Sequence, residues 1–314
     1  MKKRILTSVG IVITLILFFI MKVFVSDYFF DALIFAMAGF AAFESSKILT
    51  KAGLNNYLYV SLSFVAVQFL TNFLGIFYSL PLWLIVVIDL ASIIVMSLGC
   101  FLWSLISKRT KEEIRVREVK TTMPKFSLKK AVGCMITFIY PTFFIMLMML
   151  LNHFDSLNLT NVADFNGRLS LIILMFMFLI PIFTDTFAML TGMLIGGKKL
   201  CPKISPKKTI SGAVGGTLWC VLLSTAVYFI LKSTNYFYDS IAGGLPVWAF
   251  IIIILIGSVI AQLGDLFESY LKRKAGVKDS GNILPGHGGM LDRIDSYIFV
   301  APYLLIAFAL IVVL

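Results

Sequence analysis

The stretch LSLIILMFMFLIPIFTDTFAMLTGMLI, residues 169–195, decides the fold class. Its apolar residues follow one another without alternation, and it exceeds the roughly 20 residues that a helix needs to cross a bilayer. Only helices and closed barrels satisfy backbone polar groups in lipid, and barrel strands would alternate apolar and polar residues. The stretch therefore predicts a transmembrane helix.

The same pattern recurs along the chain. Of its 314 residues, 60% are hydrophobic, and the mean hydropathy is +0.97, which is outside the range of soluble domains. We expect an all-α fold, a polytopic bundle of about nine transmembrane helices, with spans near 5–25, 28–45, 56–75, 81–106, 131–151, 169–195, 211–232, 246–264 and 296–314. The cysteines show no pairing pattern, so we expect them to be small core residues.

The basic residues orient these helices. The net charge is +11, and nearly all of the 27 Lys and Arg residues fall in segments that alternate onto one side of the membrane. By the positive-inside rule that side is the cytoplasm. We expect a cytoplasmic N-terminus, a first helix that is retained, and a multi-pass protein of the cell membrane. His153 falls in an exterior loop, where we expect it to be solvated.

The segment FTDTFAMLTGMLIGGKKLCPKISPKKTISG, residues 183–212, carries an acid inside a span. An acid such as Asp185 costs at least about 2.5–3.5 kcal/mol at mid-helix, so it should face the bundle interior or a watery cavity. Its role is either functional or a structural hydrogen bond. Ala188, Gly192 and Gly196 form a small-residue stripe that permits close helix packing. The lysines that follow either hold phosphates or anchor the cytoplasmic end: Lys198, Lys199, Lys203, Lys207 and Lys208.

A second charged segment, GDLFESYLKRKAGVKDSGNILPGHGGMLDRID, covers residues 264–295. Asp265 and Glu268 share a face at the end of one helix, whereas Asp292 and Asp295 begin the next. Because a loop joins these ends, the acids can converge. Glu268 and Lys272, four residues apart, are expected to form a surface pair.

Together these residue types suit phosphoryl or nucleotidyl transfer. Carboxylates bind Mg²⁺, Lys and Arg bind phosphate oxygens, and glycines such as Gly288 and Gly289 let backbone approach a ligand. Each acid has a structural alternative, since Asp292 and Asp295 in a first helical turn would stabilise that helix through its dipole.

The pattern in both segments resembles the signature of phosphatidate cytidylyltransferases, also called CDP-diacylglycerol synthases. The resemblance covers about residues 180–300 and rests on Asp185-Thr-Phe-Ala188, Pro202-x-Ile204-Ser205-Pro206-x-Lys208-Thr209, Gly264-Asp265-Leu-Phe-Glu268 and His287-Gly288-Gly289-x-x-Asp292-Arg293-x-Asp295. Met193 stands where the family usually has Arg or Lys, and Ser211 where a Glu is common.

The resemblance implies transfer of CMP from CTP to phosphatidate, giving CDP-diacylglycerol and pyrophosphate. It implies Mg²⁺, as one or two divalent ions or as one divalent and one monovalent ion. Residues 131–314 would form the catalytic region, and residues 1–130 the N-terminal helices with a basic cytoplasmic linker. The expected partners are CTP, phosphatidate, membrane lipid and, in a homodimer, a second copy, with no nucleic acid.

We predict three roles among these residues. The metal ligands are Asp265 and Asp292, with Asp185 and Asp295 as second choices. The other catalytic residues are Lys208, Arg293 and His287. Substrate is predicted to bind to Lys207, Ser205, Lys272, Arg273, Lys278, Gly288 and Gly289.

Two other functions fit part of the pattern. A CTP-dependent lipid kinase would use similar substrates and give a different product. A lipid transporter or flippase would need charges near the membrane midplane. Asp89 is the only other acid that the predicted spans place well inside the membrane, which gives the transporter little support.

Overall fold

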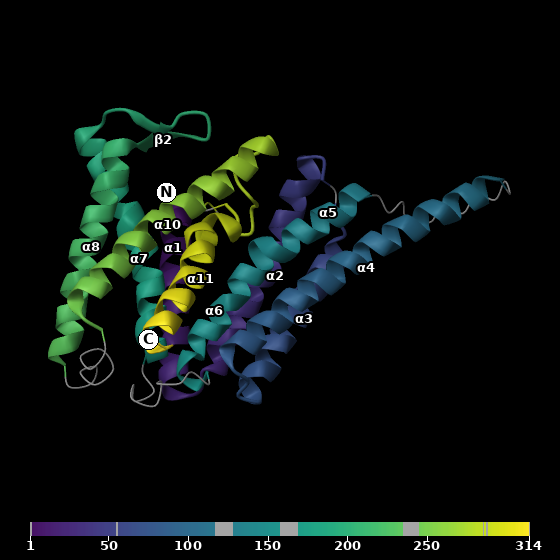
Figure 1. Ribbon diagram of the computed structural model, residues 1–314. Helices are drawn as coiled ribbons and strands as arrows, with labels where there is room; N and C mark the ends of the chain where they lie inside the picture. The colour runs from purple at the N-terminus through teal and green to yellow at the C-terminus, as the bar shows by residue number, and fades with distance from the viewer. Residues whose placement is uncertain are drawn as a thin grey trace.

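The computed structural model describes residues 2–54, 56–116, 128–157, 169–234, 245–284, 286 and 288–313. These residues form a helical bundle with one short hairpin (Figure 1). In chain order the elements are α1 (Lys2–Phe24), α2 (Tyr28–Lys51), α3 (Leu58–Phe77), α4 (Leu82–Val116), α5 (Leu128–Thr137), η1 (Phe138–Phe143), α6 (Phe144–Asn152), η2 (Phe154–Ser156), α7 (Leu169–Ile195), β1 (Lys199–Cys201), β2 (Ser205–Thr209), α8 (Ile210–Ser233), α10 (Val247–Lys274) and α11 (Leu291–Val313).

The predicted all-α membrane bundle is confirmed. Within the described residues, eight helical segments are long and apolar enough to cross a membrane, and the broken run α5–η1–α6 counts as one of them. The first predicted span corresponds to α1, whose apolar part, Val9–Phe24, is shorter than the other eight. The helices therefore have the length and composition of membrane-spanning helices, which satisfy their own backbone hydrogen-bonding groups in lipid.

Several helices run further than the predicted spans. Helix α10 continues to Lys274, α11 begins at Leu291, and α4 continues to Val116, into the segment expected to be a connecting linker. In α10 the last turn carries Lys272, Arg273 and Lys274, and cations stabilise the C-terminal end of a helix. Because α10 stays helical to Lys274, the helix also fixes the positions of the charged residues that follow its apolar part.

The lysine-rich segment after α7 is a β-hairpin, where the sequence predicted a loop. Strands β1 and β2 are antiparallel, with Lys199 opposite Thr209 and Cys201 opposite Ser205. The Thr209 hydroxyl then caps α8 by accepting a hydrogen bond from Gly212 N at 3.1 Å. Such short strands show no alternating pattern, so they could not be predicted from the sequence.

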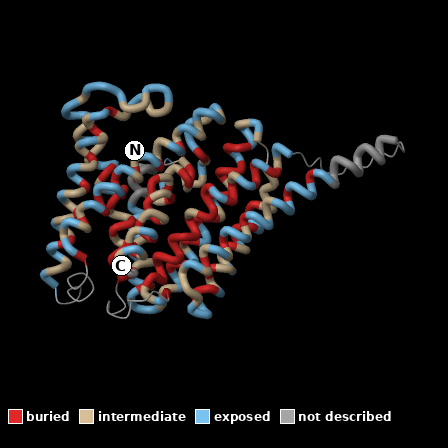
Figure 2. Tube along the Cα trace, viewed as in Figure 1, coloured by how far each residue is buried: buried red, intermediate tan, exposed pale blue. Residues whose placement is uncertain are grey.

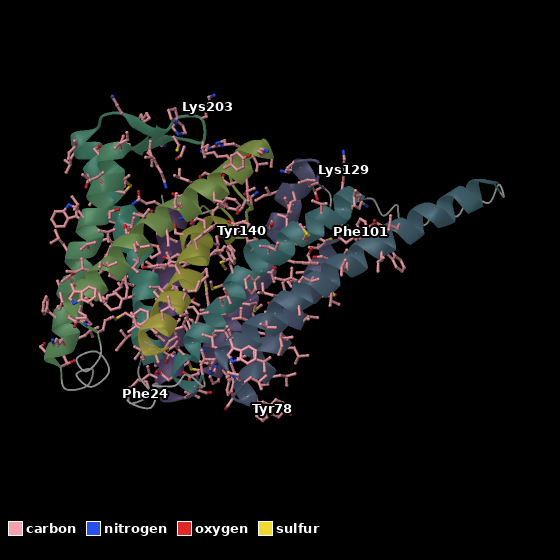
Figure 3. The ribbon with its side chains drawn as sticks, viewed as in Figure 1. Phe24, Tyr78, Phe101, Lys129, Tyr140 and Lys203 are labelled. Atoms are coloured by element: carbon pink, nitrogen blue, oxygen red, sulfur yellow. The ribbon has the colours of Figure 1, made fainter. Side chains whose placement is uncertain are left out.

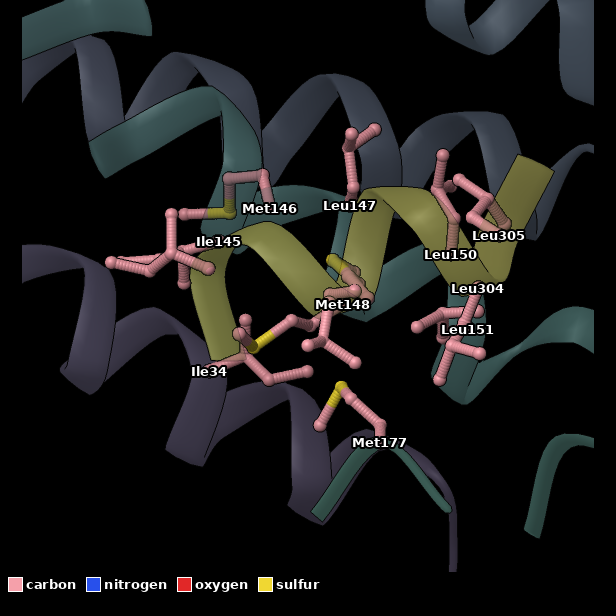
Figure 4. Packing of buried hydrophobic residues seen from close by; sticks show 14 of the residues in the cluster. Ile34, Ile145, Met146, Leu147, Met148, Leu150, Leu151, Met177, Leu304 and Leu305 are labelled. Carbon is pink, nitrogen blue, oxygen red and sulfur yellow. The ribbon is translucent and has the colours of Figure 1, made fainter. Parts of the chain in front are cut away.

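The core is centred on α6. Buried side chains lie mostly in the middle of the bundle, whereas α4 and α8 present many exposed residues (Figure 2). Met148 and Leu151 of α6 pack among Ile34 of α2, Met177 of α7 and Leu304 of α11 (Figure 4). Since lipid tails are as apolar as these side chains, van der Waals packing is what holds the helices together.

Helices α7 and α8 approach closely through small residues. A Cβ atom at Gly216 would lie 2.6 Å from the carbonyl oxygen of Thr184 and 2.7 Å from Ala188 Cβ. The predicted stripe is confirmed for Ala188 and Gly192, which face glycines of α8. A Cβ at Gly196 would meet nothing within 4 Å, so this member of the stripe lies outside the contact.

A buried polar cluster closes the end of the bundle away from the hairpin, and it corrects the prediction that His153 is solvated. His153 is 4% exposed, and its Nε2 lies 2.7 Å from Asp31 Oδ2. Asn152 Nδ2 donates to Asp31 Oδ1 at 2.8 Å, and Lys22 Nζ donates to the carbonyl oxygen of Asn152 at 2.8 Å. Burial without hydrogen bonds would be costly, and these bonds offset that cost for the His153, Asp31 and Lys22 side chains.

Asp89 is buried, as its place well inside a predicted span suggests. Asp31 and Glu44 of α2 are also buried, although the predicted span placed them near its ends. Asp89 itself accepts hydrogen bonds from Thr71 Oγ1 at 2.8 Å and Asn72 Nδ2 at 2.9 Å. It thus has local partners that join α3 to α4.

Candidate active site

The two charged segments of the sequence meet at one end of the bundle. Lys208 on strand β2 forms an ion pair with Asp265 near the end of α10. Arg273 Nε also donates to the carbonyl oxygen of Ile204, between the two strands, at 3.2 Å. This end carries Lys203 and Lys129, and the opposite end carries Phe24 and Tyr78 (Figure 3). Segments far apart in the sequence therefore contact each other at the end of the bundle that carries the hairpin.

Three carboxylates share this site. Asp185 of α7 interacts electrostatically with Asp265 of α10, and Asp295 of α11 interacts with both. Lys208 forms its ion pair with Asp265 and also interacts electrostatically with Asp185. Ser269 Oγ also donates to Asp265 Oδ1, at 3.4 Å. Asp185 is exposed, and Asp265 and Asp295 are half-buried. Of these three acids, Asp265 and Asp185 interact with Lys208, and the negative charge that remains is what a bound cation would balance.

Behind this group lies a buried charge network, where the sequence predicted a surface pair. Glu268 is fully buried, and Lys272, with an 11% exposed side chain, forms ion pairs with both Glu268 and Asp292. Its Nζ lies 2.7 Å from Asp292 Oδ1. Because these charges have little contact with solvent, they depend on one another far more than a surface pair would.

Asp292 also shapes the loop between α10 and α11. Its Oδ2 accepts hydrogen bonds from Gly289 N at 2.7 Å and from Ser280 N at 2.9 Å. Gly288 has a φ of 89°, a conformation that favours glycine, and its carbonyl oxygen accepts from Leu284 N at 3.0 Å. Asp292 therefore has the structural role considered as an alternative, because it lies in the first turn of α11 and its carboxylate accepts hydrogen bonds from backbone N–H groups. Its role as a metal ligand stays a prediction.

Tyr140 belongs to the site, and sequence reasoning missed it. The span Leu128–Asn152 breaks at η1, where Tyr140 is non-helical beside Pro141. The ring lies against Phe267, with centroids 4.9 Å apart, and the hydroxyl is buried with no hydrogen-bond partner among the described residues. It interacts electrostatically with four acids: Asp265, Glu268, Asp292 and Asp295. A proline beside a tyrosine in an apolar run was the available signal.

The structure describes all but one of the remaining predicted residues. Lys207 and Lys278 are exposed, and Ser205 is half-buried on β2. Arg293 is exposed at the start of α11 and interacts electrostatically with Tyr297, as do Asp185 and Asp295. His287 lies outside the described residues.

The two positions that depart from the family pattern differ in their surroundings. Met193 is 68% exposed near the end of α7. Ser211 donates a hydrogen bond to the carbonyl oxygen of Gly196, which links the start of α8 to the end of α7. Neither side chain touches the acids at the centre of the site through a contact in the described structure.

The donor set fits a cation that is shared with substrate. In the part of the chain that the structure describes, no three His, Cys, Asp or Glu side chains converge as they would in a metal cage made by protein alone. Mg²⁺ does not need such a cage, because it is commonly held by one or two carboxylates together with substrate phosphates. Asp265, with Asp185 and Asp295 near it, provides oxygens of this kind.

Fold and site together define a multi-pass membrane protein that gathers acidic and basic side chains at one end of its helices. Comparison with known families identifies the family of the chain. The chain belongs to the Cytidylyltransferase family, whose model matches residues 2–311.

Individual relatives match the chain over a shorter segment. It is 48% identical over 134 residues to a phosphatidate cytidylyltransferase of Rickettsia bellii. The matched segment covers 42% of this chain and 55% of that protein. A Staphylococcus saprophyticus protein of the same name is 48% identical over 131 residues, and one from Staphylococcus aureus is 49% identical over 131 residues. Each of these two matches covers 42% of this chain and 46% of the relative. The chain thus spans about half the length of the curated relatives it matches.

Proposed function

We propose that this protein is a phosphatidate cytidylyltransferase. It would transfer CMP from CTP to phosphatidate and release pyrophosphate, giving CDP-diacylglycerol for phospholipid synthesis. Family membership and the names of the relatives support this proposal. The observation that carries it is the pairing of Lys208 with Asp265, beside Asp185 and Asp295, at the end of membrane helices.

The residues suit a reaction between two anions. A phosphatidate phosphate oxygen forms a bond to the α-phosphorus of CTP, and the bond from that phosphorus to the pyrophosphate oxygen breaks. The nucleophile is already anionic, so no strong general base is needed. The main barrier is charge repulsion, which Lys207, Lys208 and Arg293 would reduce by binding phosphate oxygens. Because the hairpin is tied to α10 through Arg273, Lys208 is held beside Asp265.

The acids would hold Mg²⁺. Asp265 is the primary ligand in this proposal, with Asp295 and Asp185 beside it as ligands or as partners of bound water. Asp292 would join them only by exchanging its contact with Lys272. When bound, Mg²⁺ would neutralise charge on the phosphates and on the leaving pyrophosphate. The protein contributes the position of its carboxylates, fixed by α7, α10 and α11.

The site is proposed to face the cytoplasm, with the N-terminus on the same side. The basic segments support this orientation through the positive-inside rule. Acyl chains of phosphatidate would stay in the bilayer among the exposed apolar side chains of α7 and α8, such as Met189, Leu194 and Leu218. CTP would arrive from the aqueous side.

The position of the label in CTP tests the reaction. Purified protein in detergent receives phosphatidate, Mg²⁺ and CTP labelled on either the α- or the γ-phosphate. We expect α-label to enter the lipid product and γ-label to leave as pyrophosphate, and we expect a chelator to abolish both. Incorporation of γ-label into lipid would instead show a lipid kinase, and no incorporation from either would reject a CTP-dependent enzyme.

A further inference from the structure

Glu44 of helix α2 reaches the loop between α10 and α11 from the other half of the chain. It is completely buried, yet within the described ranges no Lys or Arg forms an ion pair with it. A buried carboxylate without such a partner must be satisfied by hydrogen bonds. Those bonds show what the residue does.

Among the described residues, the hydrogen bonds to Glu44 come from the loop and from the start of α11. Leu291 N donates to Oε2 at 2.8 Å, and Met290 N donates to Oε1 at 3.1 Å. These are N–H groups at the start of a helix, which have no partner within the helix. Glu44 therefore caps α11 from a different helix, and its charge also suits the positive end of the α11 dipole.

A third hydrogen bond connects Glu44 to Asp292. Ser280 Oγ donates to Glu44 Oε2 at 3.0 Å and accepts from Asp292 N at 3.3 Å. Ser280 N in turn donates to the Asp292 carboxylate at 2.9 Å. Glu44, Ser280 and Asp292 thus form one network. The Glu44 carboxylate fixes Ser280, and Ser280 bonds to both the backbone N–H and the carboxylate of Asp292.

The packing leaves this carboxylate little room to move. A Cβ atom at Gly281 or at Gly289 would overlap the Glu44 carboxylate, so the loop backbone lies directly against it. Gly289 N is also a donor to Asp292 Oδ2. A small displacement of Glu44 would therefore move backbone groups that hold a predicted metal ligand.

We propose that Glu44 is a positioning residue: it acts through Ser280 and the start of α11 to hold the α10–α11 loop, and with it Asp292, in place for the cation and phosphates. This inference rests on the proposed function and gives α2, in the N-terminal part of the chain, a direct part in the site. Residues that orient ligands in this way typically change metal affinity or activity by about 10- to 100-fold when replaced.

The variant Glu44→Gln tests this, because it keeps the size of the side chain and replaces one acceptor oxygen with a donor that would face backbone N–H groups. Two measurements are made on the full-length protein in detergent. Hydrogen exchange is expected to become about tenfold faster at the start of α11, from the loss of capping. The Mg²⁺ concentration for half-maximal cytidylyl transfer is expected to rise about 10- to 100-fold.

Asp31→Asn is the matched control, since it replaces another buried acid of α2 at the other end of the bundle. It should change exchange near His153 and leave both the loop and the Mg²⁺ requirement unchanged. Ser280→Ala removes the next link of the network and should reproduce the Glu44→Gln changes. If Glu44→Gln does not fold, the same two measurements on Ser280→Ala test the proposal.

The two proposals fail in different ways. The exchange measurement does not depend on the reaction, so unchanged exchange at the start of α11 in Glu44→Gln or Ser280→Ala overturns the role of Glu44. Faster exchange with an unchanged Mg²⁺ requirement also overturns it, because Glu44 would then be a structural cap alone. A wild-type protein that makes no CDP-lipid would reject the proposed function instead.

Discussion

Replacing Asp265 by Asn is expected to lower the rate of CDP-lipid formation by about 100- to 1000-fold, as removal of one preorganised electrostatic group does in other active sites. Asn keeps the shape of the side chain and removes its negative charge. The variant would therefore lose its main oxygen ligand for Mg²⁺ and the partner of Lys208. Initial rates at saturating Mg²⁺, CTP and phosphatidate measure this loss.

The control for this variant is Asp279→Asn. Asp279 is an exposed acid of the α10–α11 loop, and its replacement makes the same change of charge near the site. We expect this control to keep nearly the wild-type rate. Asp265→Asn protein with wild-type activity at saturating Mg²⁺ would show that Asp265 is not a metal ligand.

Replacing Lys272 by Met is expected to lower the free energy of unfolding by about 3–5 kcal/mol, because it leaves two buried carboxylates without their cation. Met has a similar length and fits an apolar surrounding, so the effect would come from charge. Glu268 is fully buried, and Asp292 has a 7% exposed side chain. Unfolding by denaturant in mixed micelles measures the change.

Two further variants separate charge from packing. Lys274→Met, on the same helix, removes an exposed lysine that contacts only the Tyr270 ring among the interactions described, and it should change stability by less than about 0.5 kcal/mol. Adding Glu268→Gln to Lys272→Met should recover part of the lost stability, since one buried charge disappears. A double variant less stable than Lys272→Met would contradict the network.

The spans and the two charged segments could be predicted from sequence because their physical signals are local. An apolar run of this length has no other stable conformation in lipid, and the Asp185 and Asp265–Asp295 segments carry their residues at fixed spacing. The pairing of Lys208 with Asp265 was not itself predicted, although both residues lie in the two charged segments.

The residues that were missed depend on contacts between distant segments. Glu44 lies at the end of a predicted span, where an acid normally meets water, and only the position of α11 shows that it is buried. His153 follows an apolar run, a local pattern that predicts a loop, but in the structure it is buried and pairs with Asp31, far away in sequence. Tyr140 became part of the site because its span breaks, and a local pattern does not say what a break faces.

The most direct test of the central claim, that acids from α7, α10 and α11 bind a cation together with substrate phosphates, is to locate the ion. Crystals of the protein grown with CTP and Mn²⁺ in place of Mg²⁺ would show it by anomalous scattering. We predict Mn²⁺ at about 2.1–2.2 Å from an oxygen of Asp265, close to the value for Mg²⁺, with Asp295, Asp292 or Asp185 and the CTP phosphates around it. An ion bound to the CTP phosphates with none of these four carboxylates near it would contradict the account.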